Sequence, residues 1–126
     1  MIGTGIGYAY PPQNAALQRQ IANCGAVVSQ FWPEAGPTRK AFPARNAVMS
    51  GLSLASIVVE ATETSGARTQ VRAALRHGRP VLLAAALLNQ RWAQEAARRA
   101  GVGVIRSAAE LEETLERICS ADELIA

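Results

Sequence analysis

Four short apolar runs, separated by segments with helical signals, constrain the fold of this chain more than any other feature of its sequence. The runs are Ala26–Ser29, Ser56–Val59, Val81–Ala84 and Val102–Ile105. Runs of this length and composition are typical of strands that are buried on both faces of a sheet. Because strands that alternate with helices form parallel sheets, the sequence predicts an α/β fold of three layers, with helices on both faces of the sheet (αβα). We expect a mainly parallel sheet of 4–5 strands, with Ile2 in the additional strand.

Helical segments fill the intervals between these runs. Proline suits the first turn of a helix and glycine the residue after its end, and these two residue types set most of the boundaries. Ser107 and Glu110 form a capping box that marks the start of the last helix, and residues 120–126 are expected to be a frayed tail. The expected helices cover 11–24, 43–51, 67–77, 89–100 with Asn89 as the N-cap, and a final segment from 107.

Length and composition favour one domain over residues 1–126. The longest apolar stretch, Val81–Leu88, is far shorter than the roughly 20 residues that span a bilayer. No basic segment of the kind found in signal peptides stands at the start, so we expect a cytoplasmic protein. Cys24 and Cys119 have no metal-ligand spacing and are expected to be buried and reduced.

The charge is distributed unevenly along the chain. Residues 1–99 hold eleven basic residues against four acidic ones, and residues 100–126 hold two against six. Lys40 is the only lysine, and arginine binds phosphate well because its planar fork donates two parallel hydrogen bonds. The basic part of the chain is typical of a protein with a polyanionic partner, although arginine-rich composition without a functional meaning explains it equally well.

Two segments near the start carry residues that suit phosphate and base binding. Gly3, Gly5 and Gly7 alternate in a glycine loop whose backbone N–H groups are candidates for facing a phosphate, although a flexible turn is the plain alternative. The second segment combines cations with an aromatic ring at a helix start, where anions are favoured. Its ring is a candidate for stacking on a base, and a packing role with solvated cations is the alternative. Its candidate residues are Arg39, Lys40, Phe42, Arg45 and Asn46.

A third segment, Glu60–Arg68, follows the most strand-like run and opens a helix. Ser65 and Gly66 at this helix start are candidates for an anion cradle to which Arg68 adds charge, and ordinary N-capping is the alternative. Glu60 is a candidate for accepting a hydrogen bond from a ribose hydroxyl or for orienting Arg45. Downstream, Arg68, Arg72 and Arg76 recur every four residues and so line one helix face. A phosphate backbone would relieve their repulsion, although a solvated face is the commoner explanation for such a row.

Residue types needed for catalysis or metal binding are scarce. His77 is the only histidine and Asp122 the only aspartate. Nucleophile systems that need a histidine, and carboxylate clusters for Mg²⁺, therefore have few members to draw on. We expect no catalytic residue, no metal site and no cofactor.

Several strings, taken together, resemble the DNA-processing protein A (DprA/Smf) family over about residues 2–105. They are Gly3–Gly5 with Tyr10–Asn14, Phe42–Asn46 with Ser50–Ser53, Val58–Ala61 with Ser65–Gly66, and Gly78–Val81. The resemblance implies a Rossmann-like domain that binds single-stranded DNA in DNA uptake, natural transformation and recombination, with loading of a RecA-type recombinase. It also implies a homodimer, no membrane association and no catalytic activity.

Residue roles follow from the same resemblance. Arg39 or Lys40, together with Arg45, are expected to contact phosphates, and Phe42 a base. Ser65, Gly66 and Arg68 are expected to line the same basic pocket. The chain departs from the family pattern at its start, where we expect a short variant that lacks the first βα unit, a truncated open reading frame or one piece of a longer protein. It also departs at Ala47 and Gln70, where an arginine and a threonine are common.

Two other functions compete with DNA binding. The first is a nucleotide-binding protein or nucleoside-monophosphate hydrolase related to the lysine-decarboxylase-like cytokinin-activating family, with Glu60 as the candidate acid. The glycine-rich motif of that family is missing from residues 62–66. The second is a scaffold that binds a protein partner, for which the acidic helix with Glu110, Glu112, Glu113 and Glu116 is the candidate surface.

Overall fold

The computed structural model describes residues 1–123 and, among these, the side chains up to Ala121. The chain forms two compact units, unit 1 (Met1–Met49) and unit 2 (Ser50–Ala126). The boundary between them falls inside helix α2 (Ala41–Leu52). No helix among the described residues is long and apolar enough to cross a membrane.

Unit 2 contains a parallel three-stranded sheet. Its strands are β1 (Ser56–Val58), β2 (Val81–Ala84) and β3 (Val102–Ile105), and β2 lies in the centre. In the register of the sheet, Val58 pairs with Leu83, and Leu83 pairs with Val104 on the other side. Parallel pairing needs crossover connections, and a helix lies between each strand and the next, as the sequence predicts.

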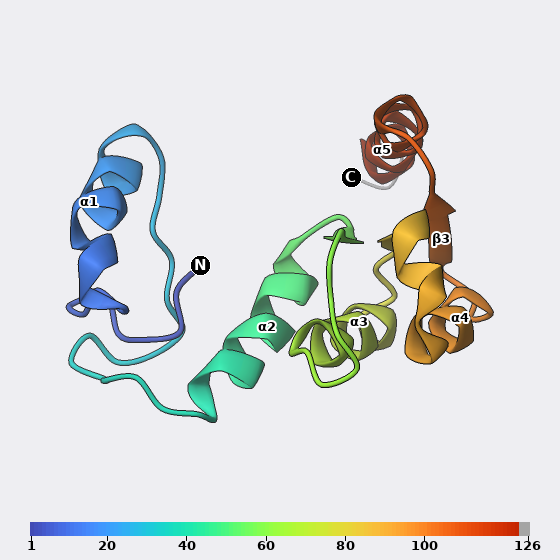
Figure 1. The fold of residues 1–126 in the computed structure, drawn as a ribbon. Helices are drawn as coiled ribbons and strands as arrows, with labels where there is room; N and C mark the ends of the chain where they lie inside the picture. The colour runs from blue at the N-terminus through green and yellow to red at the C-terminus, as the bar shows by residue number, and fades with distance from the viewer. Residues whose placement is uncertain (124–126) are drawn as a thin grey trace. The chain divides into compact units, whose positions relative to one another are not determined.

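Helices cover both faces of this sheet (Figure 1). One face packs against α3 (Ala67–Arg76) and α4 (Arg91–Ala97), which follows the short 3₁₀ helix η2 (Ala85–Asn89). On the other face lies α5 (Ala108–Glu123), which packs near Leu82 and Gly103. The three layers therefore confirm the predicted α/β architecture.

The core of unit 2 lies between the sheet and the α3–α4 layer. The strands contribute Val58, Val81 and Leu83, and α4 contributes Trp92 as the largest buried side chain of its helix. Complete burial of one such aliphatic side chain stabilises a fold by about 1.5–3 kcal/mol. The remaining buried members are alanines, valine and leucine from the helices and the connecting segments: Ala61, Val71, Ala74, Leu87, Ala93 and Ala96.

Local signals set several helix boundaries in unit 2. Gly78 follows α3 with φ +70°, and Gly101 precedes β3 with φ +82°, a backbone region that favours glycine. At the start of α5, the Glu110 N–H donates to Ser107 Oγ over 3.2 Å, as a capping box predicts. The Glu110 carboxylate, however, accepts from the N–H of Arg106 over 2.8 Å, one residue earlier than in the standard capping box.

Unit 1 contains few regular elements and little buried apolar surface. The 3₁₀ helix η1 (Pro12–Asn14) leads into α1 (Ala15–Cys24), which has no buried residue. The peptide bond between Tyr10 and Pro11 is cis. Backbone hydrogen bonds join the start of the chain to later segments, including a 2.9 Å bond from the Ile2 N–H to the Val28 oxygen.

Two expected strands are not found among the described residues. The run at 26–29 forms no strand, and Ile2 forms none either, so the sheet has three strands instead of four or five. The prediction was wrong because an apolar run becomes a strand only where a neighbour supplies a hydrogen-bond ladder. Here the single bond between Ile2 and Val28 takes the place of a ladder.

Other boundaries also needed correction. Helix α2 begins at Ala41, two residues before Pro43, which lies within the first turn, where proline is tolerated. Asn89 ends η2, and Gln90 precedes α4, which stops at Ala97. The expected frayed tail is helical up to residue 123, and residues 124–126 lie outside the described part. The cysteines are free as expected, but both are exposed instead of buried.

Candidate nucleic-acid interface

The start of α2 brings an aromatic ring against the glycine loop of unit 1. A Cβ placed on Gly3 would lie 2.9 Å from Cδ1 of Phe42, so the absence of a side chain there allows the ring to approach the backbone. Tyr10 lies beside the same ring, with centroids 6.0 Å apart and planes tilted by 49°. Phe42 is half-buried and Tyr10 is exposed. Two aromatic rings, from segments about thirty residues apart, therefore share one place on unit 1.

Arg45 ties the first residue of the chain to α2. Its Nη1 donates to the Met1 carbonyl oxygen over 3.0 Å, and its Nε donates to Asn46 Oδ1 over 2.8 Å. Both side chains are half-buried. These two bonds fix the position of the guanidinium. Because a guanidinium carries five N–H donors, other donors remain to bind a ligand. The structure therefore gives Arg45 a positioning role within unit 1 in addition to its charge.

Arg39 and Lys40 lie in the turn that precedes α2, and both are exposed. The turn is held by Thr38, whose Oγ1 accepts from the Ala41 N–H over 3.2 Å. The start of a helix carries a partial positive charge, and two cations next to it increase the local positive potential. This turn therefore provides a site of positive potential adjacent in sequence to Phe42.

The glycine loop uses backbone N–H groups for its own packing. Gly5 N donates to the Ala35 oxygen over 2.7 Å, and Gly7 N donates to the Pro33 oxygen over 3.0 Å. A Cβ on Gly5 would overlap the carbonyl groups of Trp32 and Pro33. These contacts assign Gly5 and Gly7 to close packing of two backbone segments, which is a different use of glycine from a phosphate cradle.

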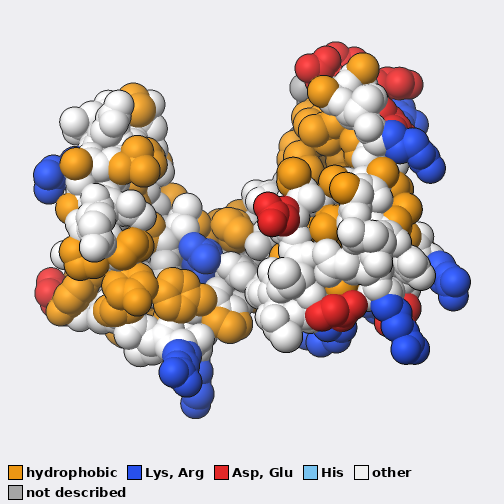
Figure 2. All heavy atoms as spheres, in the orientation of Figure 1, with side chains coloured by type: hydrophobic (Ala, Val, Ile, Leu, Met, Phe, Trp, Pro, Cys, Tyr) orange, Lys and Arg blue, Asp and Glu red, His pale blue; other side chains and the backbone are white. Residues whose placement is uncertain are grey.

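Sequence reasoning missed the most exposed aromatic residue of this unit. Trp32 is 86% exposed, Tyr10 53% and Tyr8 42%. In Figure 2, hydrophobic side chains cover a large part of the visible face of unit 1. Large contiguous patches of exposed apolar side chains are uncommon on soluble proteins and indicate interaction surfaces. The available signal was the position of Trp32 in a segment without periodicity, between Phe31 and Pro33.

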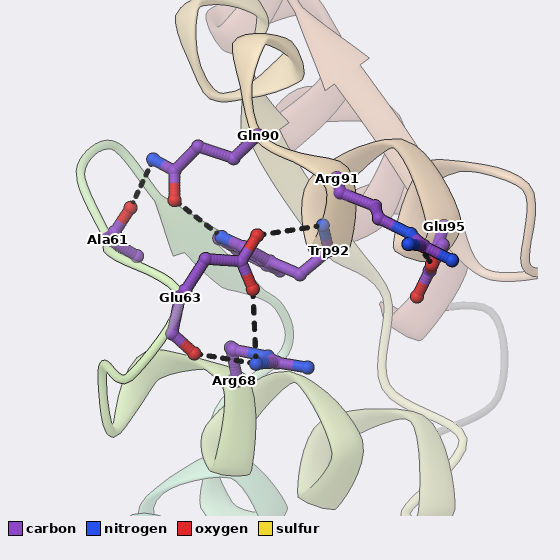
Figure 3. Close-up of polar contacts among 7 residues, drawn as sticks. All are labelled: Ala61, Glu63, Arg68, Gln90, Arg91, Trp92 and Glu95. Carbon is purple, nitrogen blue, oxygen red and sulfur yellow. Dashed lines mark hydrogen bonds and ion pairs between the residues drawn. The ribbon is translucent and has the colours of Figure 1, made fainter.

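In unit 2, the loop after β1 is held by polar contacts. Ser65 Oγ accepts from the Ala67 N–H over 3.2 Å at the start of α3, which is the capping arrangement. Arg68 Nη1 donates to the Glu63 carbonyl oxygen over 2.6 Å and lies 3.3 Å from Glu63 Oε2 (Figure 3). Glu60 and Gly66 are exposed. Arg68 is thus partly committed to its own loop.

The same loop is joined to the start of α4. Gln90 Nε2 donates to the Ala61 oxygen over 2.5 Å, and Gln90 Oε1 accepts from Trp92 Nε1 over 2.8 Å (Figure 3). Glu63 Oε1 accepts from the Trp92 backbone N–H over 3.4 Å. A carboxylate at a helix start is favourable because of the partial positive charge there. Gln90 and Glu63 therefore position this loop, and sequence reasoning did not identify the role of either residue.

The predicted site residues fall into two groups. Unit 1 holds the glycine loop together with Arg39, Lys40, Phe42, Arg45 and Asn46, and within it the structure brings Phe42 to Gly3. Unit 2 holds Glu60, Ser65, Gly66 and Arg68. The part of the chain that the structure describes contains no group of three or more His, Cys, Asp or Glu side chains that could hold a metal ion.

Comparison with known proteins agrees with the family resemblance. Residues 1–122 match the family described as DNA recombination-mediator protein A. Protein Smf from Synechocystis is 42% identical over 81 residues, which are 64% of this chain and 20% of the relative. DNA processing protein DprA from Streptococcus pneumoniae is 40% identical over 81 residues, or 64% of this chain and 29% of the relative. The matched segment thus spans less than a third of the length of these relatives.

Two solved structures share the fold. DNA processing protein A from Streptococcus pneumoniae superposes with a TM-score of 0.75 at 30% identity, over 89% of this chain and 40% of its own. DNA processing protein A from Helicobacter pylori, whose structure concerns its single-stranded DNA binding mode, superposes with a TM-score of 0.78 at 24% identity. This match covers 91% of the present chain and 54% of the Helicobacter pylori chain. These neighbours confirm the Rossmann-like fold. The family match over nearly the whole chain, together with these relatives, places the chain in the DNA recombination-mediator protein A family of DNA processing proteins.

Proposed function

We propose that this chain binds single-stranded DNA through unit 1, as part of DNA processing and recombination. The observation that carries the proposal is the pair of aromatic rings, Phe42 and Tyr10, together with the exposed cations Arg39 and Lys40 in the turn that precedes Phe42. Stacking on an aromatic ring contributes about 1–3 kcal/mol per base and tolerates any sequence. Cations in the adjacent turn add the phosphate contacts that supply most of the affinity for single strands.

The remaining candidate residues have supporting parts in the proposal. Arg45 and Asn46 hold the start of the chain against α2 and so keep Phe42 in place, while Arg45 directs its other donors to phosphate. Trp32 is a further candidate for stacking on a base, because it is the most exposed large hydrophobic side chain of unit 1. Ser65, Gly66, Arg68 and Glu60 form a second group of candidate contacts at the end of β1, within unit 2.

The partners in the proposal come from the family. The Helicobacter pylori neighbour is described by its single-stranded DNA binding mode, which supports the choice of ligand. A homodimer, a RecA-type recombinase as protein partner, a cytoplasmic location and a role in natural transformation complete the proposal. Because the chain spans only part of its curated relatives, each of these partners has to be tested on this chain itself.

The test is fluorescence anisotropy of a labelled oligo-dT at two salt concentrations. Tyr10→Ala and Phe42→Leu are each expected to weaken binding about 5- to 150-fold, the equivalent of one lost stack. The salt slope is the fall in log affinity per unit rise in log salt concentration, and each phosphate contact on a single strand contributes about 0.7 to it. Arg39→Gln combined with Lys40→Gln should therefore lower the salt slope by about 1.4. Circular dichroism of each variant would establish that the fold is retained.

Matched controls come from α1 of the same unit. Leu17→Ala removes an exposed apolar side chain and Arg19→Gln an exposed cation, and neither belongs to the candidate site. Both are expected to bind oligo-dT as the unchanged chain does. An equal loss of affinity for oligo-dT in the controls and the site variants would refute the assignment of the site to these residues. No binding of oligo-dT at low salt would refute the proposed function itself.

A further inference from the structure

The surface between α3 and α4 of unit 2 is a groove of arginines, of which only Arg68 belongs to the candidate residues of the proposed DNA site. A hollow of about 180 Å³ is lined by Arg68, Arg72 and Arg99, and a second of about 340 Å³ by Arg72, Arg76 and Arg99. Arg72 and Arg99 line both hollows, so the two are neighbours. We define the arginine groove as the surface formed by Arg68, Arg72, Arg76 and Arg99.

Two helices bring these side chains together. Arg68, Arg72 and Arg76 recur every four residues along α3, which places them on one face of that helix. Arg99 follows the end of α4 and reaches the same hollows from the other side. The convergence is therefore a property of the fold, since Arg99 lies more than twenty residues away in the sequence.

The groove carries charge that the protein itself leaves largely unbalanced. Arg68 is paired with Glu63 at 3.3 Å, and Glu95, which also lines the smaller hollow, is paired with Arg91 at 3.0 Å (Figure 3). Three members of the groove form no ion pair within the described part of the chain: Arg72, Arg76 and Arg99. Like charges at such spacing repel, and a bound polyanion removes that cost.

The chemistry of the groove suits phosphate better than a whole nucleotide. Trp92, the aromatic residue that lines the smaller hollow, is only 5% exposed, and its Nε1 donates to Gln90. It therefore presents little ring surface on which a base could stack. Guanidinium groups bind phosphate oxygens through paired hydrogen bonds and carry no preference for a base. A phosphate backbone is the ligand that matches this combination.

We propose that the arginine groove is a second contact surface for single-stranded DNA, which binds the phosphates of a strand longer than the one held by unit 1. The proposal rests on the proposed function, because it assigns to the same ligand a further set of contacts. It adds sequence-independent, salt-sensitive phosphate contacts on unit 2 to the aromatic and phosphate contacts on unit 1.

The test compares a short oligo-dT of about 6 nucleotides with a long one of about 30, by anisotropy between 50 and 200 mM salt. The triple variant Arg72→Gln, Arg76→Gln, Arg99→Gln is expected to lower the salt slope for the long strand by about 2, that is, three contacts at about 0.7 each. A fourfold rise in salt should then cost the unchanged chain about 16-fold more affinity than the variant. The slope for the short strand should stay the same.

A triple variant of equal charge serves as the control. Arg19→Gln, Arg98→Gln, Arg117→Gln removes three exposed arginines outside the groove. If the control lowers the slope for the long strand as much as the groove variant does, only net charge matters and the proposal is overturned. The proposal is also overturned if the groove variant keeps the salt slope of the unchanged chain but no longer forms an oligomer that the unchanged chain shows in sedimentation velocity. That result would assign the groove to protein association, for which the acidic α5 of a second copy is the natural counterpart.

The outcomes separate the two proposals. If the groove variant has a lower salt slope for the long strand while Tyr10→Ala and Phe42→Leu bind normally, the groove proposal stands and the assignment of the site in unit 1 fails. If only the aromatic variants weaken binding, the groove proposal fails alone. If the unchanged chain binds neither strand at low salt, both proposals are overturned. Phenylglyoxal labelling with the long strand bound gives a direct readout, in which Arg72, Arg76 and Arg99 are expected to be protected.

Discussion

Gly5→Ala tests whether the glycine loop exists to let two backbone segments pack closely. An added Cβ would overlap the carbonyl groups of Trp32 and Pro33, which belong to the backbone and have no rotamer through which to move away. The Gly5 N–H bond to the Ala35 oxygen would then lengthen or break. Forcing an extra carbon into a packed site typically costs about 1–3 kcal/mol. In a unit with as little apolar core as unit 1, that loss is a large part of its stability.

Hydrogen exchange of the Gly7 amide measures this effect directly, because that N–H donates to Pro33 at the same contact. A cost of about 1–3 kcal/mol corresponds to a drop of about 5- to 150-fold in its protection factor. Gly36→Ala is the control, since an added Cβ there has no atom within 4 Å and its backbone is not in the left-handed region. That change should be neutral, or should stabilise the unit by about 0.4–1 kcal/mol because alanine reduces the conformational entropy of the unfolded chain.

The comparison is decisive in either direction. If Gly5→Ala leaves the Gly7 amide as protected as Gly36→Ala does, the close approach of the two segments is not what requires glycine. The loop would then again be a candidate for phosphate binding through backbone N–H groups. Loss of protection in Gly5→Ala alone would establish the packing role and predict a displacement of the segment that carries Trp32.

Two further predictions concern the stability of unit 2. Leu83→Ala, in the fully buried centre of the sheet, should lower the free energy of unfolding by about 2–5 kcal/mol in urea melts, while the exposed Leu52→Ala should change it by no more than about 0.5. A similar effect of both would contradict the location of the core. Gly101→Ala should cost about 1–2 kcal/mol in the same melts, because φ is +82° and the new Cβ would lie 3.3 Å from Leu75; an unchanged midpoint would refute that reasoning.

The elements of unit 2 could be predicted because their signals are local. The glycine after α3 and the serine at the start of α5 each act within a few residues, and both marked true helix boundaries. Gly101 marks the start of β3, whereas α4 ends earlier than this glycine predicts, at Ala97. The run at 26–29 is short and mostly apolar like the true strands, but whether a strand forms depends on a partner elsewhere in the chain. Composition alone therefore did not separate it from β2.

The candidate site could be predicted as a list of residue types and not as an arrangement. The approach of Phe42 to Gly3 joins residues far apart in the sequence, and no local pattern indicates it. Trp32 was overlooked because a tryptophan is buried on average, so that exposure has to be seen in the structure. The row of arginines on α3 was visible from its spacing, but its meeting with Arg99 depends on how α3 and α4 pack.

The two tryptophans give this chain a built-in pair of optical reporters. Each unit contains one, and their surroundings are opposite: Trp32 is 86% exposed and Trp92 is 5% exposed. Emission from the exposed indole is red-shifted and open to iodide, whereas emission from the buried one is blue-shifted and shielded. A ligand that stacks on unit 1 would therefore quench the red component and leave the blue one unchanged, so that events in the two units can be followed separately without adding a label.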